Sequence, residues 1–178
     1  SNLRNLVERG FQVVAVVTNR PSCGGAELAR RRGIPLGEFP QSRFGSAVER
    51  DAALRDFLIA EGVQLVVCAG YDRVFTAPLF ESFSGRIINI HPSLLPAFAG
   101  GMDAVEQALA AGVPVSGCTV HHVIEEVDAG PVILQAEVPV LPGDTPETLR
   151  ARIHDEEHRL LPQAIQLVTN AARAAVGQ

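Results

Sequence analysis

Short runs rich in valine and isoleucine alternate with helix-type segments, and this alternation constrains the fold more than any other feature of the chain. Five runs have the length and β-branched composition of strands, at residues 11–18, 63–69, 86–91, 117–124 and 131–140. Four segments have helical periodicity, at residues 26–32, 46–61, 103–111 and about 146–172. Strands and helices in alternation predict an α/β layer fold with a mostly parallel sheet.

The bulk composition is that of a globular protein and excludes several classes. The chain has 178 residues, of which 47% are hydrophobic and 20% charged, and this length suits one compact domain. The net charge is −5 without a basic run, so we expect neither a nucleic-acid nor a membrane partner. Every apolar run is shorter than the ~18 residues that span a bilayer.

The three cysteines, Cys23, Cys68 and Cys118, lie far apart in the chain and form no C-x-x-C pair. Such spacing argues against a disulfide framework and against a zinc knuckle. The sequence therefore predicts reduced thiols and a cytoplasmic location.

The segment Asn89-Ile90-His91-Pro92 places two polar side chains at the end of a predicted strand. Because side chains alternate along a strand, Asn89 and His91 project from the same face. Pro92 ends the strand, so both residues lie at its carboxyl end, where open α/β sheets bind ligands. Two buried polar groups need partners, since an unpaired one costs about 1–3 kcal/mol. Either a substrate oxygen or loop backbone could supply them.

A second polar segment combines adjacent histidines, His121 and His122, with Asp128 in a following Asp-Ala-Gly-Pro loop. Adjacent strand residues face opposite sides, so the two histidines are a poor chelating pair and no metal site is expected. Asp128 fits a simple turn role. It could also orient and charge the His91 imidazole, as general acid–base catalysis requires.

These segments together resemble the phosphoribosylglycinamide formyltransferases of the formyltransferase superfamily. The resemblance rests on residues 89–96, 117–121 and 127–133, with further similarity at 13–20, 70–73 and 142–145. It implies a Rossmann-like three-layer sandwich with an antiparallel C-terminal pair of strands. It further implies that residues 1–178 form a single formyltransferase domain, N-terminally shortened, without the family's first strand and glycine-rich loop.

The resemblance implies formyl transfer from 10-formyltetrahydrofolate to the amine of 5-phosphoribosylglycinamide in de novo purine (IMP) biosynthesis. In this reaction Asn89 would stabilise the oxyanion of the tetrahedral intermediate. His91 would contact the same oxygen or protonate the leaving folate nitrogen. Asp128 would fix His91 and help to move the proton that the amine releases. The amine attacks directly, so the family's chemistry requires no nucleophilic serine or cysteine, and no metal is expected.

The resemblance also implies two sets of binding residues. The folate would contact Arg73, Val74, Asn89, Ile124 and Asp128. The ribonucleotide would contact Ser1, Asn2, Pro92, His154 and Glu157, with Glu157 on the ribose hydroxyls and His154 near the phosphate. From the residues alone, Arg73 is equally compatible with a surface arginine and Glu157 with a solvated helix face.

Three alternatives stay open at this point. The chain could hydrolyse 10-formyltetrahydrofolate, with water in place of the amine, or belong to another formyltransferase branch. It could also be a truncated folate-binding module without turnover. A missing central strand would leave an exposed strand edge, and association of two copies into a homodimer could cover it.

Overall fold

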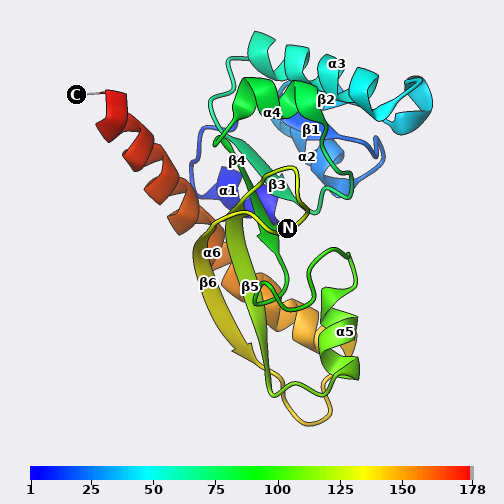
Figure 1. Ribbon diagram of the computed structural model, residues 1–178, viewed down its shortest axis with the longest axis vertical. Coiled ribbons are helices and arrows are strands. Elements are labelled where there is room, and N and C mark those ends of the chain that lie inside the picture. The colour runs from blue at the N-terminus through cyan, green and yellow to red at the C-terminus, as the bar shows by residue number, and fades with distance from the viewer. Residues whose placement is uncertain (177–178) are drawn as a thin grey trace. The chain divides into compact units, whose positions relative to one another are not determined.

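The computed structural model describes residues 1–176, which form two compact units (Figure 1). The N-terminal unit consists of Ser1, Leu3–Val66 and Gly70–Ile87. The C-terminal unit consists of Asn2, Val67–Ala69 and the chain from Ile88 onward. Each unit is described separately below.

The N-terminal unit contains a short parallel pair of strands joined by a helix. Its elements are α1 (Asn2–Glu8, of which Asn2 belongs to the other unit), β1 (Val16–Thr18), α2 (Gly24–Arg32), β2 (Leu36–Glu38), η1 (Gln41–Arg43), α3 (Ala47–Ala60) and α4 (Ala77–Phe83). Strand β1 pairs with β2 in parallel, and α2 makes the crossover between them. Gly33 ends α2 in the left-handed conformation, which glycine adopts without steric cost.

Helices α3 and α4 pack against one another through a small apolar core. The Ser46 side chain caps α3 by accepting a hydrogen bond from the Glu49 N–H. Leu54 and Leu58 of α3 are buried, as are Leu79 and Phe83 of α4. The packing of these helices supports the loop that joins β3 to α4.

The C-terminal unit is built on a sheet of four strands in the order β3-β4-β5-β6. Its elements are β3 (Val66–Ala69), β4 (Ile87–His91), α5 (Ala104–Ala110), β5 (Val115–His122), β6 (Val132–Pro139) and α6 (Pro146–Val176). The first residues of β3 and β4, Val66 and Ile87, belong to the N-terminal unit. Strand β5 pairs antiparallel with both β4 and β6. Helix α6 packs along β5 and β6, with Leu149, Ile153 and Leu161 fully buried (Figure 1).

The structure confirms the predicted α/β class, with parallel pairing and an antiparallel C-terminal pair formed by β5 and β6. The run predicted as a strand at 11–18 is a strand only at Val16–Thr18, because only these residues pair with β2. The antiparallel pairing of β4 with β5 was not predicted. Strand β2 and helix α4 were also not predicted, because three and seven residues are too few to show a clear period.

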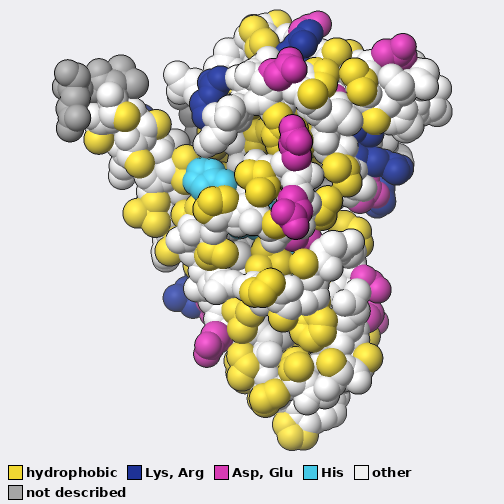
Figure 2. All heavy atoms as spheres, in the orientation of Figure 1, with side chains coloured by type: hydrophobic (Ala, Val, Ile, Leu, Met, Phe, Trp, Pro, Cys, Tyr) yellow, Lys and Arg dark blue, Asp and Glu magenta, His cyan; other side chains and the backbone are white. Residues whose placement is uncertain are grey.

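Acidic and basic side chains are interspersed among hydrophobic ones on the face shown in Figure 2. None of the helices within residues 1–176 is both long and apolar enough to cross a membrane.

Candidate active site

Strands β4 and β5 assemble the candidate site by placing their polar residues opposite one another. Asn89 pairs with His121 across the two strands, and His91 pairs with Thr119. Directly opposed residues of an antiparallel pair project from the same face. The four polar side chains therefore share one face of the sheet, as the alternation of Asn89 and His91 predicted for β4.

Asp128 lies between the two imidazoles of this face. Its Oδ2 is 3.5 Å from His91 Nδ1, and its Oδ1 is 3.5 Å from His121 Nε2. Oδ2 also accepts a hydrogen bond from the Gly100 N–H at 2.8 Å. Hydrogen bonding to His121 lowers the pKa of the Asp128 carboxyl, and the Gly100 N–H and the charge of His91 lower it further. The structure thus brings together the three predicted catalytic residues and keeps the carboxylate ionised at neutral pH.

The backbone at Asp128 adopts a left-handed conformation, with φ of 54°. This region is sterically unfavourable for residues with a Cβ atom, although aspartate tolerates it better than most. In this conformation the Asp128 carboxylate lies 3.5 Å from a nitrogen of each imidazole.

The hydrogen bonds of the two histidines indicate where their protons lie. His91 Nε2 is 3.0 Å from the Phe98 carbonyl oxygen, and His121 Nδ1 is 2.9 Å from that of His122. A carbonyl oxygen only accepts, so these nitrogens carry protons. The second nitrogen of each ring faces Asp128, and His121 Nε2 also lies 3.2 Å from Asn89 Nδ2. A proton taken up by either ring would be stabilised by the carboxylate, so the cluster can hold and transfer a proton.

A buried threonine fixes the loop that follows His91. Thr119 Oγ1 donates to the Ser93 carbonyl at 2.7 Å and accepts from the Leu95 N–H at 3.0 Å. Gln135 Nε2 donates to the same hydroxyl at 2.9 Å. These bonds hold the start of the Pro92–Pro96 segment against β5 and so fix the chain next to His91.

Asn2 and Glu157, both predicted to bind the ribonucleotide, lie in direct contact. Asn2 Nδ2 donates to Glu157 Oε2 at 2.9 Å, and Glu157 is only 4% exposed. The alternative of a solvated helix face is therefore wrong, because this face of α6 is covered. Burial raises the pKa of the Glu157 carboxyl. His154, also predicted to bind the ribonucleotide, lies 3.9 Å from this carboxylate and is partly exposed.

One polar atom of this pair has no partner within the described residues. Asn2 Oδ1 is buried and accepts no hydrogen bond there. Buried polar atoms are nearly always paired in folded proteins, so an unpaired acceptor beside a buried carboxylate is suited to a ligand hydroxyl or amine.

Of the residues predicted to contact folate, Asn89 lies on β4 and the other four lie on two loops. Arg73 and Val74 are in the loop between β3 and α4, where the Arg73 side chain is 48% exposed and Val74 is 59% exposed. Ile124 is an exposed residue of the loop between β5 and β6 that also contains Asp128. Ser1, which is predicted to contact the ribonucleotide and not the folate, is an exposed residue that immediately precedes α1. Because the side chains of Arg73, Val74 and Ile124 are exposed, a ligand can contact them without a change in the protein backbone.

His121 is the residue of this cluster that the sequence analysis left without a role. The sequence pattern excludes a shared metal site with His122, which faces the other way, but it predicts no catalytic role for His121. Its position opposite Asn89 follows from the register of β4 and β5.

Within residues 1–176, no group of three or more histidine, cysteine or acidic side chains is arranged to hold a metal ion.

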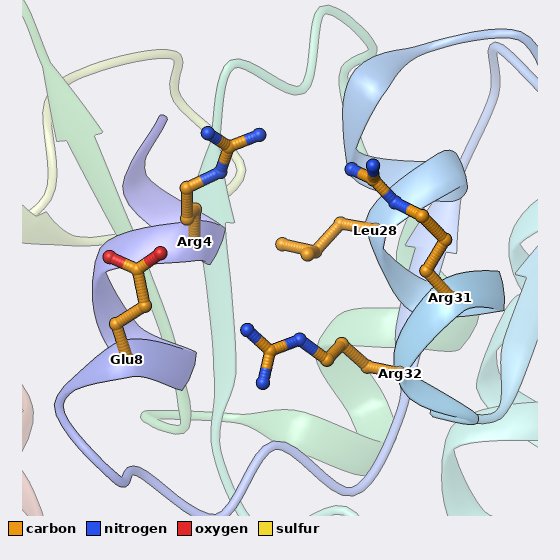
Figure 3. Close-up of a pocket in the computed structure, with 5 residues that line it drawn as sticks. All are labelled: Arg4, Glu8, Leu28, Arg31 and Arg32. Carbon is orange, nitrogen blue, oxygen red and sulfur yellow. The ribbon is translucent and has the colours of Figure 1, made fainter.

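A cavity of about 350 Å³ lies between α1 and α2 in the N-terminal unit (Figure 3). It is lined by the residues Arg4, Glu8, Leu28, Arg31 and Arg32. None of these residues is a predicted site residue, and none belongs to the cluster of Asn89, His91, His121 and Asp128.

Comparisons with known proteins show a family to which this chain is similar. The model of the formyl transferase family matches residues 3–165. The chain is 38% identical to phosphoribosylglycinamide formyltransferase of Haemophilus influenzae, over 89% of this chain and 74% of that protein. It is 45% identical to the trifunctional purine biosynthetic protein adenosine-3 of Gallus gallus, over 90% of this chain but only 16% of that protein. The chain thus spans a small part of the trifunctional relatives.

A solved structure extends the likeness to three dimensions. Glycinamide ribonucleotide transformylase 1 from Symbiobacterium toebii superposes with a TM-score of 0.89 at 48% identity, covering 96% of this chain and 81% of that one.

Proposed function

Because the chain belongs to the formyl transferase family, we propose that it transfers a formyl group from 10-formyltetrahydrofolate to the amine of 5-phosphoribosylglycinamide, in purine biosynthesis. The observation that carries the proposal is the placement of Asp128 within 3.5 Å of both imidazoles, with Asn89 beside His121. This set supplies an amide donor, a proton carrier and a carboxylate, which are the groups that acyl transfer to an amine requires.

In the proposed reaction, the substrate amine attacks the formyl carbon and forms the new C–N bond. The carbonyl electron pair moves onto the formyl oxygen, and Asn89 Nδ2 donates a hydrogen bond to the resulting oxyanion. His91 acts as the proton carrier instead, because its Nε2 donates to the Phe98 carbonyl and its Nδ1 faces Asp128. A preorganised donor at an oxyanion accelerates acyl transfer by about 10²–10³-fold.

Collapse of the intermediate requires two proton movements. The attacking nitrogen becomes positively charged and loses a proton, which the Asp128–His91 pair accepts. The oxyanion electron pair then re-forms the carbonyl as the C–N bond to the folate breaks. The folate nitrogen leaves with the electron pair of that bond and receives the proton that the Asp128–His91 pair took from the amine. The ionised Asp128 and the imidazole that faces it suit this exchange, because each stabilises a proton held by the other.

We assign the ribonucleotide to Asn2, His154 and Glu157, together with Ser1 and Pro92. The buried Glu157 carboxylate suits ribose hydroxyls, which donate to it, and the unpaired Asn2 Oδ1 can accept from the same ligand. Within the C-terminal unit, Asn89 and Asp128 are assigned to the formyl group of the folate. The further folate contacts that the resemblance implies are Ile124 in the same unit and Arg73 and Val74 in the N-terminal unit.

Incubation of the protein with both substrates tests the proposal. We expect one formylated ribonucleotide and one tetrahydrofolate per formyl donor consumed, measured by absorbance of the folate product and by mass spectrometry. The control omits the ribonucleotide. Formate release at the same rate without the amine would instead indicate hydrolysis, and absence of any product would contradict the proposal.

Replacement of Glu157 by glutamine should weaken ribonucleotide binding and stabilise the fold. Burial raises the pKa of Glu157 in the folded state above its ordinary value of 4.5. Folding stability that is present below the ordinary pKa is therefore lost as pH rises through the folded pKa. Glu157→Gln removes this loss and should raise Tm at neutral pH relative to the wild-type protein. The KM for the ribonucleotide should rise by about 10-fold or more, the equivalent of about 1.4 kcal/mol.

Glu156→Gln is the matched control, since Glu156 is the preceding residue of α6 and pairs with Arg159 instead. It should leave the KM for the ribonucleotide and the pH dependence of Tm unchanged. A Glu157→Gln variant with unaltered KM for the ribonucleotide would exclude Glu157 from the substrate site.

A further inference from the structure

A buried ion pair on α3 lies beneath the loop of residues 70–76, which presents Arg73 and Val74. Arg50 Nε donates to Asp51 Oδ1 at 2.8 Å, and the two side chains are only 3% and 0% exposed. Removing two charges from water is costly, and the attraction between them offsets this only when further hydrogen bonds satisfy both groups. The partners that satisfy this pair therefore show what it holds in place.

Most of those partners belong to the same loop. Arg50 Nη2 donates to the Val74 carbonyl at 3.0 Å, while Nη1 donates to Gln41 Oε1 at 3.0 Å. Asp51 Oδ2 accepts from the Thr76 N–H at 2.7 Å and from the Thr76 hydroxyl at 2.8 Å. The pair thus fixes the backbone on both sides of Phe75.

The first half of the loop is held at a second point. Asp72 Oδ1 accepts from Asn19 Nδ2 at 2.7 Å, and the Asp72 carboxylate forms an ion pair with Arg20. Within the loop, the Tyr71 and Phe75 rings stack with centroids 5.1 Å apart. The side chains of Arg73 and Val74 lie between these attachments and stay exposed.

We propose that Arg50 and Asp51 are positioning residues for folate recognition, which hold the loop of residues 70–76 in the conformation that presents Arg73 and Val74 to the pterin. The inference rests on the proposed function, because it takes Arg73 and Val74 as folate contacts. Its basis is that a costly buried charge pair directs three of its four outward hydrogen bonds to residues 74 and 76. A loop fixed before binding loses less conformational entropy when the ligand arrives.

Helix α3 provides a matched control within the same protein. Arg55 and Asp56 repeat the Arg-Asp sequence five residues later, with Arg55 Nε donating to Asp56 Oδ1 at 2.8 Å, but this pair is exposed. Asp51→Asn and Asp56→Asn make the same chemical change in a buried and an exposed pair.

The kinetic test compares these two variants. Asp51→Asn should raise the KM for 10-formyltetrahydrofolate by about 10-fold, the equivalent of about 1.4 kcal/mol. The KM for the ribonucleotide and kcat should stay within about 2-fold of wild type, and Asp56→Asn should change none of the three. An equal rise in both KM values, or a fall in kcat alone, would overturn the positioning role.

The chain also contains a probe of the loop that needs no activity. Tyr71 is the single tyrosine, and the chain has no tryptophan, so intrinsic emission comes from this loop. Quenching of that emission by iodide should increase in Asp51→Asn and stay unchanged in Asp56→Asn. Unchanged quenching in a folded Asp51→Asn variant would overturn the proposal.

Arg50→Lys keeps the test decisive if Asp51→Asn does not fold, as judged by circular dichroism. Lysine retains a positive charge beside Asp51 but lacks the planar fork that reaches both Val74 and Gln41. It should show the same rise in folate KM and in quenching, and wild-type values for both would overturn the proposal. A wild-type protein that binds no folate would refute the proposed function, whereas the quenching data would still report whether the pair holds the loop.

Discussion

Replacement of His91 by alanine is expected to lower kcat for formyl transfer by about 10²–10⁴-fold, the contribution of a general acid–base group. The buried His91 imidazole has one nitrogen fixed by the Phe98 carbonyl and the other facing Asp128. Alanine removes the proton carrier, while the surrounding backbone bonds can remain. Steady-state rates at saturating concentrations of both substrates measure the effect.

His122→Ala is the control for this prediction. His122 lies one residue from His121 on β5 and so projects from the opposite face of the sheet, and alanine keeps its backbone carbonyl. This variant should retain kcat within about 3-fold, a change below the about 10²-fold loss of a single catalytic donor. If His91→Ala kept wild-type kcat, the catalytic assignment of the cluster would be wrong.

Gly130→Ala is expected to reduce both activity and stability strongly. A Cβ atom at position 130 would lie 1.7 Å from the His122 carbonyl oxygen, which no repacking of side chains can relieve. The backbone must therefore move at the point where His122 receives the hydrogen bond from His121 and where the Asp128 loop joins β6. We expect kcat to fall by at least about 10²-fold. The free energy of unfolding should fall by about 1–3 kcal/mol, the typical cost of inserting an extra group into a packed core.

Thermal unfolding and steady-state kinetics on the same preparation measure both effects. Gly24→Ala is the control, because a Cβ atom there meets no atom within 4 Å and its φ is negative or extended. It should leave both quantities at wild-type values. A Gly130→Ala variant of normal stability and activity would show that the loop can shift without disturbing Asp128.

The alternation of side chains along a strand was sufficient to predict that Asn89 and His91 share a face, because that property is local. The role of His121 was not predictable in this way. It depends on which residue of β5 lies opposite Asn89, and the antiparallel pairing of β4 with β5 is a tertiary property. The sequence shows that His91 and His121 are present, but it does not show which residues of β4 and β5 lie opposite one another.

Glu157 illustrates a second limit of sequence reasoning. Helical periodicity is compatible with a solvated face at this position, and only the resemblance to formyltransferases suggested a binding role. Its burial depends on contact with Asn2, 155 residues earlier in the chain. Similarly, the buried Arg50–Asp51 pair and the exposed Arg55–Asp56 pair have the same local sequence, so only packing distinguishes them.

The left-handed backbone at Asp128 determines which substitution can isolate the contribution of its charge. Alanine would remove the carboxylate and also place an ill-suited residue at φ of 54°, so its effect would mix lost chemistry with a displaced loop. Asparagine accepts this conformation about as readily as aspartate and preserves the shape of the side chain. Comparison of the two variants would therefore separate the electrostatic contribution of the carboxylate from the cost of its unusual backbone geometry.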